Sequence, residues 1–172
     1  MLMGIDITDH WKNLVKTLFP ELKEGISFEF TSPVNYNYNC LSWALGCDTH
    51  PFENSKGAFW PWKEIPDDTA DGWAQVCALH GFTLTEIDNT GFVDGIEKIA
   101  ILQDEDGDLH ATRQGVPGIW KSKLGDMGPD IDHIGLSGIE SAYGKVVRVL
   151  QRELRVQKRR TSKTATRSRV KA

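Results

Sequence analysis

The sequence predicts an α+β fold in which the N-terminal helices pack on an antiparallel β-sheet. Apolar residues recur at helical spacing in the first half of the chain, whereas alternating or wholly apolar runs fill much of the second half. Turn residues separate those runs at short spacing, as in consecutive strands of a meander. Since the helices precede the strands and do not alternate with them, we expect the helices to pack on one face of the sheet.

Three helices are predicted. Residues 11–18 carry one apolar stripe at helical spacing, and the helix is capped by Thr8 or Asp9 and ended by Pro20. Residues 40–46 form a short helix, because Asn39 is a good N-cap and Gly46 suits the position just after a helix. Residues 69–80 have a second apolar face. The residue at position 40 therefore stands in the first turn of a helix.

The β-rich half begins after the third helix. A short extended segment precedes it near the N-terminus, and a Gly- and Asp-rich stretch, residues 125–138, is expected to be a loop. The predicted strands are residues 28–30, 82–87, 96–103, 109–114, 119–124 and 145–150.

Charge divides the chain into an acidic body and a basic end. Residues 151–172 hold nine Lys or Arg and one acidic residue, a net charge of +8, which leaves −12 on residues 1–150 of the total of −4. We expect one domain over residues 1–150 and a disordered basic tail over residues 151–172. An acidic body argues against a nucleic-acid-binding fold, so nucleic acid is expected to bind weakly at most, through the tail.

The N-terminal residues, the apolar stretches and the cysteines indicate the compartment and the cofactors to expect. The N-terminal residues lack the basic-then-apolar order of a signal peptide and no stretch is long enough to cross a bilayer, so we expect a cytoplasmic protein without membrane contact. Cys40, Cys47 and Cys77 are odd in number and show no zinc-finger spacing, so neither disulfides nor a metal site is expected. No cofactor is expected.

Cys40 is the candidate nucleophile. A cysteine reacts as its thiolate, and the first turn of a helix favours that anion through unpaired N–H groups and the helix dipole. Of the five histidines, only His110 lies on a predicted central strand, where its placement is rigid. The competing interpretation is that Cys40 is a small buried residue and His110 an ordinary sheet histidine.

Several segments resemble a bacterial domain family of unknown function. The segment 38–46, Tyr-Asn-Cys-Leu-Ser-Trp-Ala-Leu-Gly, is similar to a Y-N-C-x-x-W-A-x-G signature. The segments 110–114 and 118–125 are similar to H-A-x-R-Q and G-x-W-x-S-K-L-G. The resemblance extends through Trp60-Pro61-Trp62 and spans about residues 8–150.

The layout also resembles papain-like cysteine hydrolases of the NlpC type. These place a cysteine at a helix start, a histidine on a strand and a polar orienting residue on the next strand. The resemblance implies Cys40 as nucleophile, His110 as base and Ser122 as the third residue. Ser122 departs from the usual amide, carboxylate or imidazole, and Asp132 or His133 is the alternative. Candidates for oxyanion or substrate binding are Tyr36, Tyr38, Asn39, Trp60, Trp62, Arg113 and Lys123.

Two functions compete at this stage. The first is a cysteine hydrolase that cleaves a peptide or another acylated substrate, which predicts a partly exposed Cys40 thiol within reach of the His110 ring. The second is a papain-like binding module without catalysis, in which Trp60 and Trp62 line a groove. Arg113 and Lys123 suit a substrate carboxylate, or pair with surface acids such as Asp104, Asp106 or Asp108.

Overall fold

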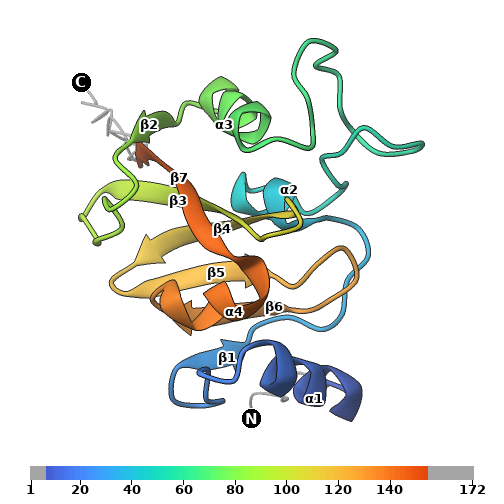
Figure 1. The fold of residues 1–172 in the computed structure, drawn as a ribbon, viewed down its shortest axis with the longest axis vertical. Helices are drawn as coiled ribbons and strands as arrows, with labels where there is room; N and C mark the ends of the chain where they lie inside the picture. The colour runs from blue at the N-terminus through green and yellow to red at the C-terminus, as the bar shows by residue number, and fades with distance from the viewer. Residues whose placement is uncertain (1–6, 155–172) are drawn as a thin grey trace, which may run out of the picture.

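The structure, a computed structural model, describes residues 7–154 of the chain (Figure 1). The helices are α1 (Asp9–Leu18), α2 (Cys40–Ala44), α3 (Ala70–Leu79) and α4 (Glu140–Tyr143), with a 3-10 helix, η1 (Ser137–Ile139). The strands are β1 (Phe28–Phe30), β2 (Thr83–Thr85), β3 (Ile96–Gln103), β4 (Leu109–Val116), β5 (Ile119–Lys123), β6 (Asp130–Ile134) and β7 (Lys145–Glu153).

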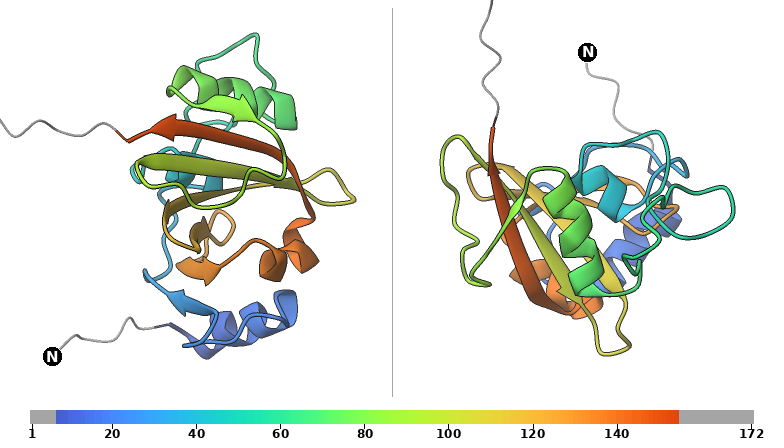
Figure 2. Two further views of the ribbon diagram at one scale, coloured as in Figure 1. Left: turned by 90° about the vertical axis from the view of Figure 1, so that its left-hand side faces the viewer. Right: turned by 90° about the horizontal axis from the view of Figure 1, so that it is seen from above.

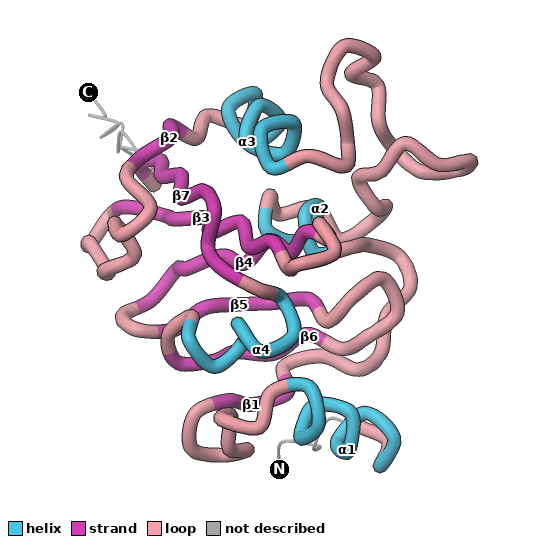
Figure 3. The backbone as a smooth tube through the Cα atoms, viewed as in Figure 1, coloured by secondary structure: helices cyan, strands magenta, loops and turns pink. Residues whose placement is uncertain are grey.

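The described strands form one antiparallel sheet in the order β1-β6-β5-β4-β3-β7-β2. Strands β3 to β6 follow one another as a meander, as the turn spacing predicts. β7 then returns beside β3, and the short strands β1 and β2 form the two edges (Figure 3). The predicted α+β class is therefore confirmed.

Helices cover both faces of this sheet, so the prediction of a single covered face is wrong. Ile99 and Ile101 of β3 pack in a core with α2 and α3, whereas Ala100 and Leu102 pack in a second core with α1 and η1. α3 and α1 accordingly lie at opposite ends of the molecule (Figure 2). The reason lies in β3, because its central residues are apolar on both faces and both faces must be shielded from water.

The start of α2 is fixed by its cap. The Asn39 side chain accepts a hydrogen bond from the backbone N–H of Ser42, and the backbone N–H of Asn39 donates to the Ser42 hydroxyl, 3.0 Å each. Gly46 follows the helix with φ +83°, a conformation that favours glycine. The helix predicted from Asn39 and Gly46 is present, with Cys40 as its first residue, and it packs on β4 and β5.

One predicted loop is wrong. Residues 125–138 contain β6 and the start of the 3-10 helix η1, and β6 pairs with β5 on one side and β1 on the other. The sequence did not predict this strand because it contains Asp130 and Asp132, and aspartate is depleted in strands and favours turns. Their polar side chains alternate with Ile131 and His133, which point into the second core.

The domain ends slightly later than predicted. β7 continues to Glu153 and pairs with β2 and β3, so the first residues assigned to the tail belong to the sheet. Arg152 holds this end in place, because its guanidinium donates to Glu97 Oε2 and to the His80 carbonyl, both at 2.8 Å, and lies over the Phe82 ring. The rest of the predicted tail, residues 155–172, lies outside the described residues. Within residues 7–154 every helix is too short or too polar to span a bilayer.

Gly144 provides a test of the chain path between α4 and β7. Its φ is +81°, and a Cβ at this position would collide with the backbone of Gln103 and Asp104. We expect Gly144→Ala to lower the free energy of unfolding by about 2 kcal/mol or more, or roughly 4–8 °C in Tm. Gly91→Ala is the matched control, because nothing lies within 4 Å of its Cβ position. Equal melting temperatures of the two variants in calorimetry would contradict the close approach of Gly144 to the backbone of Gln103 and Asp104.

Candidate functional site

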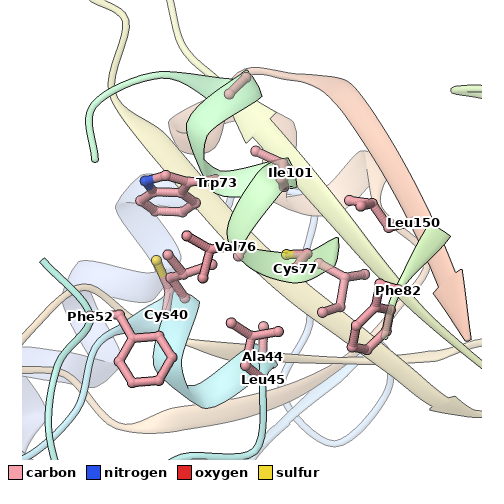
Figure 4. Close-up of a cluster of buried hydrophobic side chains, with 14 residues drawn as sticks. Cys40, Ala44, Leu45, Phe52, Trp73, Val76, Cys77, Phe82, Ile101 and Leu150 are labelled. Carbon is pink, nitrogen blue, oxygen red and sulfur yellow. The ribbon is translucent and has the colours of Figure 1, made fainter. Parts of the chain in front are cut away.

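Cys40 is buried at the start of α2. Its side chain is 8% exposed and packs among Phe52, Trp73 and Val76, as Figure 4 shows. The expectation of a partly exposed thiol is therefore wrong. The reason is the long segment between α2 and α3, which folds back over the helix start and covers it with aromatic side chains.

The surroundings of the thiol combine two opposing effects. Burial raises the pKa of Cys40 to about 11, because a thiolate loses its hydration there. The backbone N–H groups of Ala111, Leu41 and Cys40 itself act in the opposite direction and lower it. The resting group is therefore a neutral thiol, because the effect of burial exceeds that of the three backbone groups.

His110 is buried on β4 and anchored on two sides. Its side chain is 1% exposed, and its Nε2 lies 3.2 Å from the Ser122 hydroxyl. The Tyr143 ring is stacked on the imidazole, with the ring centroids 3.6 Å apart and the planes parallel. Burial, with a smaller contribution from His133, lowers the pKa of His110 to about 3, so the ring is neutral.

The predicted contact between the thiol and the imidazole is not found in the part of the chain that the structure describes, where the two groups are not hydrogen-bonded. Cys40 packs on the face of β4 that carries Ala111, whereas His110 points to the opposite face, toward Tyr143. Two observations connect them. The Ala111 N–H that acts on the thiol belongs to the peptide bond that follows His110, and a Cys40 thiolate would raise the already burial-raised pKa of Tyr143.

Ser122 lies where a third residue was expected. It is fully buried on β5, the strand next to His110, and its hydroxyl contacts three groups. Besides His110 Nε2, these are His133 Nε2 at 2.8 Å and Thr112 Oγ1 at 2.9 Å. His133, one of the two alternatives for the third residue, thus reaches the site through Ser122. The other, Asp132, faces away and pairs with Lys121 at 3.0 Å.

Lys123 and Tyr38, two residues predicted to bind substrate, are engaged inside the protein. The fully buried Lys123 ammonium donates to the carbonyls of Gly125 and Gly128, at 3.3 and 2.5 Å, and burial lowers its pKa to about 8. The Tyr38 hydroxyl donates to Asp130 Oδ2 at 2.8 Å, and burial raises its pKa to about 12. These side chains hold the segment after β5 beside Cys40, because their polar groups have partners there.

Asn39 and Tyr36 also lack the oxyanion- or substrate-binding positions that the resemblance implies. The Asn39 amide is used entirely within the fold, since it accepts from the backbone N–H groups of Ser42 and Phe52 and donates to the Phe52 carbonyl. Tyr36 is 68% exposed, away from the buried thiol. In this structure Asn39 is therefore a capping residue, and Tyr36 lies on the surface.

Trp60 and Trp62 form part of the first core. Their rings meet edge to face with centroids 5.1 Å apart, and Trp60 Nε1 donates to the Ile65 carbonyl. Arg113 lies 3.7 Å from Glu97 and over the Trp43 ring, not beside the acids of the β3–β4 turn. None of these three side chains lines a groove at Cys40 in the closed arrangement described by the structure.

Tyr143 and Thr112 are the neighbours of His110 that the sequence alone did not identify. Thr112 follows His110 by two residues on β4, so strand alternation places both on one face. Tyr143 had no comparable pattern, because α4 is a single turn. Among residues 7–154, no three His, Cys, Asp or Glu side chains are grouped to hold a metal ion.

The buried histidines predict an acid-labile fold. The pKa is lowered to about 3 at His110 and to about 4 at His133, against ~6.5 in an unfolded chain. The unfolded chain therefore takes up protons first as pH falls, and stability is lost from about pH 6.5 downward. Each histidine contributes a loss of about 2 kcal/mol between pH 7 and pH 5.

Calorimetry at the two pH values measures this effect. His110→Asn should remove about half of the acid loss attributed to the pair, whereas the exposed His10→Asn should leave it unchanged. A wild-type Tm that is the same at pH 5 and pH 7 would show that the histidines are not buried as neutral rings.

Comparison with known proteins gives a match to one family model. No curated protein and no solved structure matches the chain. The model of a domain of unknown function (DUF7689) matches residues 29–151, which include the whole site from Tyr38 to Tyr143. That match covers well over half of the sequence, as the resemblance to a family of unknown function led us to expect. The chain is therefore a member of the DUF7689 family.

Proposed function

We propose that the protein is a papain-like cysteine hydrolase that cleaves an amide, isopeptide or thioester bond through an acyl-enzyme. The Cys40 sulfur attacks the carbonyl carbon while His110 accepts the thiol proton. The bond to the leaving group then breaks, and the imidazolium returns the proton to the departing nitrogen or sulfur. Water hydrolyses the resulting thioester and restores the thiol.

The observation that carries this proposal is the set of backbone N–H groups around the thiol. Those of Cys40 and Leu41 come from the first turn of α2, and that of Ala111 comes from β4. Such N–H groups stabilise a thiolate and, in acyl transfer, the oxyanion that forms beside it. Ordinary packing of a buried cysteine does not require them. The order helix start, strand, neighbouring strand for Cys40, His110 and Ser122 supports the papain-like assignment.

The described arrangement is a closed state of this site. A proton transfer from a thiol with a pKa of about 11 to an imidazole with a pKa of about 3 costs on the order of 10 kcal/mol. Burial is the largest cause of both shifts. Admission of substrate and water therefore removes most of that cost. We assign the opening to the segment between α2 and α3, which covers the thiol, and to Tyr143, which covers the imidazole from a one-turn helix.

A binding module without catalysis is the second candidate. It is favoured by the burial of the thiol at 8% exposure and by the separation of Cys40 and His110 on opposite faces of β4. In that case the polar groups of the site are structural, and Cys40→Ala leaves ligand binding unchanged. The two candidates differ in whether an acyl group ever resides on Cys40.

Acylation by 4-nitrophenyl acetate tests the hydrolase. We expect one acetyl group on Cys40, located by intact mass and peptide mapping, followed by its hydrolysis. His110→Ala should slow acylation by roughly 100-fold, because general-base catalysis contributes about that much. Cys47→Ser is the matched control and should acylate like the wild type. Acetyl groups spread over Cys47 and Cys77, with no dependence on His110, would favour the binding module.

Phe52 is predicted to control access to the thiol, because it packs on Cys40 from the segment that covers the start of α2. Phe52→Ala removes this ring and admits water, which lowers the thiol pKa toward its ordinary value of ~8.5. Iodoacetamide should then label Cys40 about tenfold faster or more at pH 8. Phe52→Leu keeps an apolar side chain over the thiol, and its labelling rate should stay close to that of the wild type. Equal rates in the alanine variant and the wild type would contradict the assignment of Phe52 as the cover.

A further inference from the structure

The side chain of Lys123 lies on the same face of the sheet as the Cys40 thiol. Thr112 of β4 stands opposite Ser122 of β5, and their hydroxyl groups are in contact, so both project from one face. Because side chains alternate along a strand, the neighbouring residues Ala111 and Lys123 project from the other face. Ala111 packs there in the first core together with Cys40. Lys123 is therefore a basic group on the side of the sheet that holds the thiol.

Strands β4 and β5 separate where the thiol lies. Their pairing ends at Thr112 and Ser122, so it does not include Ala111 and Lys123. The Ala111 N–H is one of the backbone groups that act on the Cys40 thiol, and α2 packs on both strands. The thiol thus lies beside the point where β5 leaves β4, next to the strand position of Lys123.

The Lys123 ammonium is a fully buried cation with a free donor. Nζ donates to the carbonyls of Gly125 and Gly128, and it lies 5.2 Å from the centroid of the Tyr38 ring. An ammonium group has three N–H donors, so one of them has no acceptor among the described residues. Within residues 7–154 no carboxylate forms an ion pair with Nζ. Its positive charge is therefore available to another anion.

We propose that Lys123 is the counter-ion of the Cys40 thiolate, whose charge it stabilises from the point where β4 and β5 separate. A nearby opposite charge favours the ionised form of a group, and a buried pair is screened little by water or salt. The effect is reciprocal, since a Cys40 thiolate raises the pKa of Lys123. The charge interaction needs no substrate, whereas its use in acyl transfer rests on the proposed hydrolase.

This pairing has a characteristic pH dependence. Burial lowers the pKa of Lys123 to about 8, so the ammonium stabilises the thiolate below that pH and loses its proton above it. The other titratable groups that face the thiol or the ammonium are Asp126, Asp130, Tyr38 and Tyr143. Burial raises the pKa of both tyrosines, that of Tyr38 to about 12, and carboxyl groups ordinarily titrate at about pH 4. A change near pH 8 is therefore specific to Lys123.

Iodoacetamide labelling of Cys40 in the full chain, followed by peptide mapping from pH 6 to pH 10, tests the inference. The wild-type rate should rise about tenfold per pH unit up to about pH 8 and more slowly over the next unit, as the cation is lost. Lys123→Met removes the charge but keeps an unbranched chain. It should label roughly tenfold more slowly than the wild type at pH 7 and at about the same rate at pH 10.

Lys123→Arg keeps a positive charge at every pH of the experiment. It should label at close to the wild-type rate at pH 7, without the slower rise above pH 8. Lys121→Met is the matched control, because Lys121 lies on the same strand and face but pairs with Asp132 at 3.0 Å. Its profile should equal that of the wild type. A purely structural role of Lys123 would change the rate by the same factor at every pH, which would contradict the inference.

A wild-type rate that rises steadily through pH 8 overturns the inference even if no variant folds. A slower rise above pH 8 that persists in Lys123→Arg overturns it as well, because another group would then be its cause.

Acetylation by 4-nitrophenyl acetate separates this inference from the proposed function. A labelling profile that depends on Lys123, without an acetyl group on Cys40, would support the counter-ion and argue against the hydrolase. Acetylation of Cys40 that depends on His110, with a labelling profile indifferent to Lys123, would overturn the counter-ion alone.

Discussion

The sheet is covered on both faces, and this constraint determines how every polar group near Cys40 is arranged. A buried polar group without a partner costs free energy, so most of them have one inside the protein, although Trp43 Nε1 and Asp130 Oδ1 have none among the described residues. The Asn39 amide is used in the cap of α2, and the Lys123 ammonium is bound by the carbonyls of Gly125 and Gly128. The same requirement joins His110 to Ser122 and His133. Residues that the papain-like resemblance assigns to substrate binding thus have partners inside the fold.

The two-sided cover also explains why the thiol and the imidazole are both neutral. Desolvation disfavours the thiolate and the imidazolium together, and an ion pair between Cys40 and His110 would need water or a substrate to form. Backbone N–H groups of α2 and β4 act against this effect, because they lower the pKa of the thiol. The groups that favour a thiolate are therefore part of the backbone, whereas burial by side chains opposes it.

Local sequence patterns predicted those elements whose position is determined by neighbouring residues in the chain. Asn39 and Gly46 bracket a helix because a cap and a positive φ are short-range requirements, and the apolar run of β3 identified a central strand. β6 was missed because its aspartates hide a strand that is stabilised by its two neighbours. The burial of Cys40 depends on Phe52 and Trp73, which lie on other segments of the chain. No window of sequence around Cys40 contains that information.

The gap that the sequence left at the third residue has a physical explanation in the register of the sheet. A serine alone would orient a histidine weakly, since its hydroxyl both donates and accepts and is free to rotate. Two neighbours restrict that freedom here, because Ser122 donates to Thr112 Oγ1 at 2.9 Å and its oxygen also lies 2.8 Å from His133 Nε2. With its proton directed at Thr112, Ser122 has a lone pair for the His110 ring 3.2 Å away. The contact between Ser122 and His110 is thus held by side chains from three strands, β4, β5 and β6, and no window of sequence shows it.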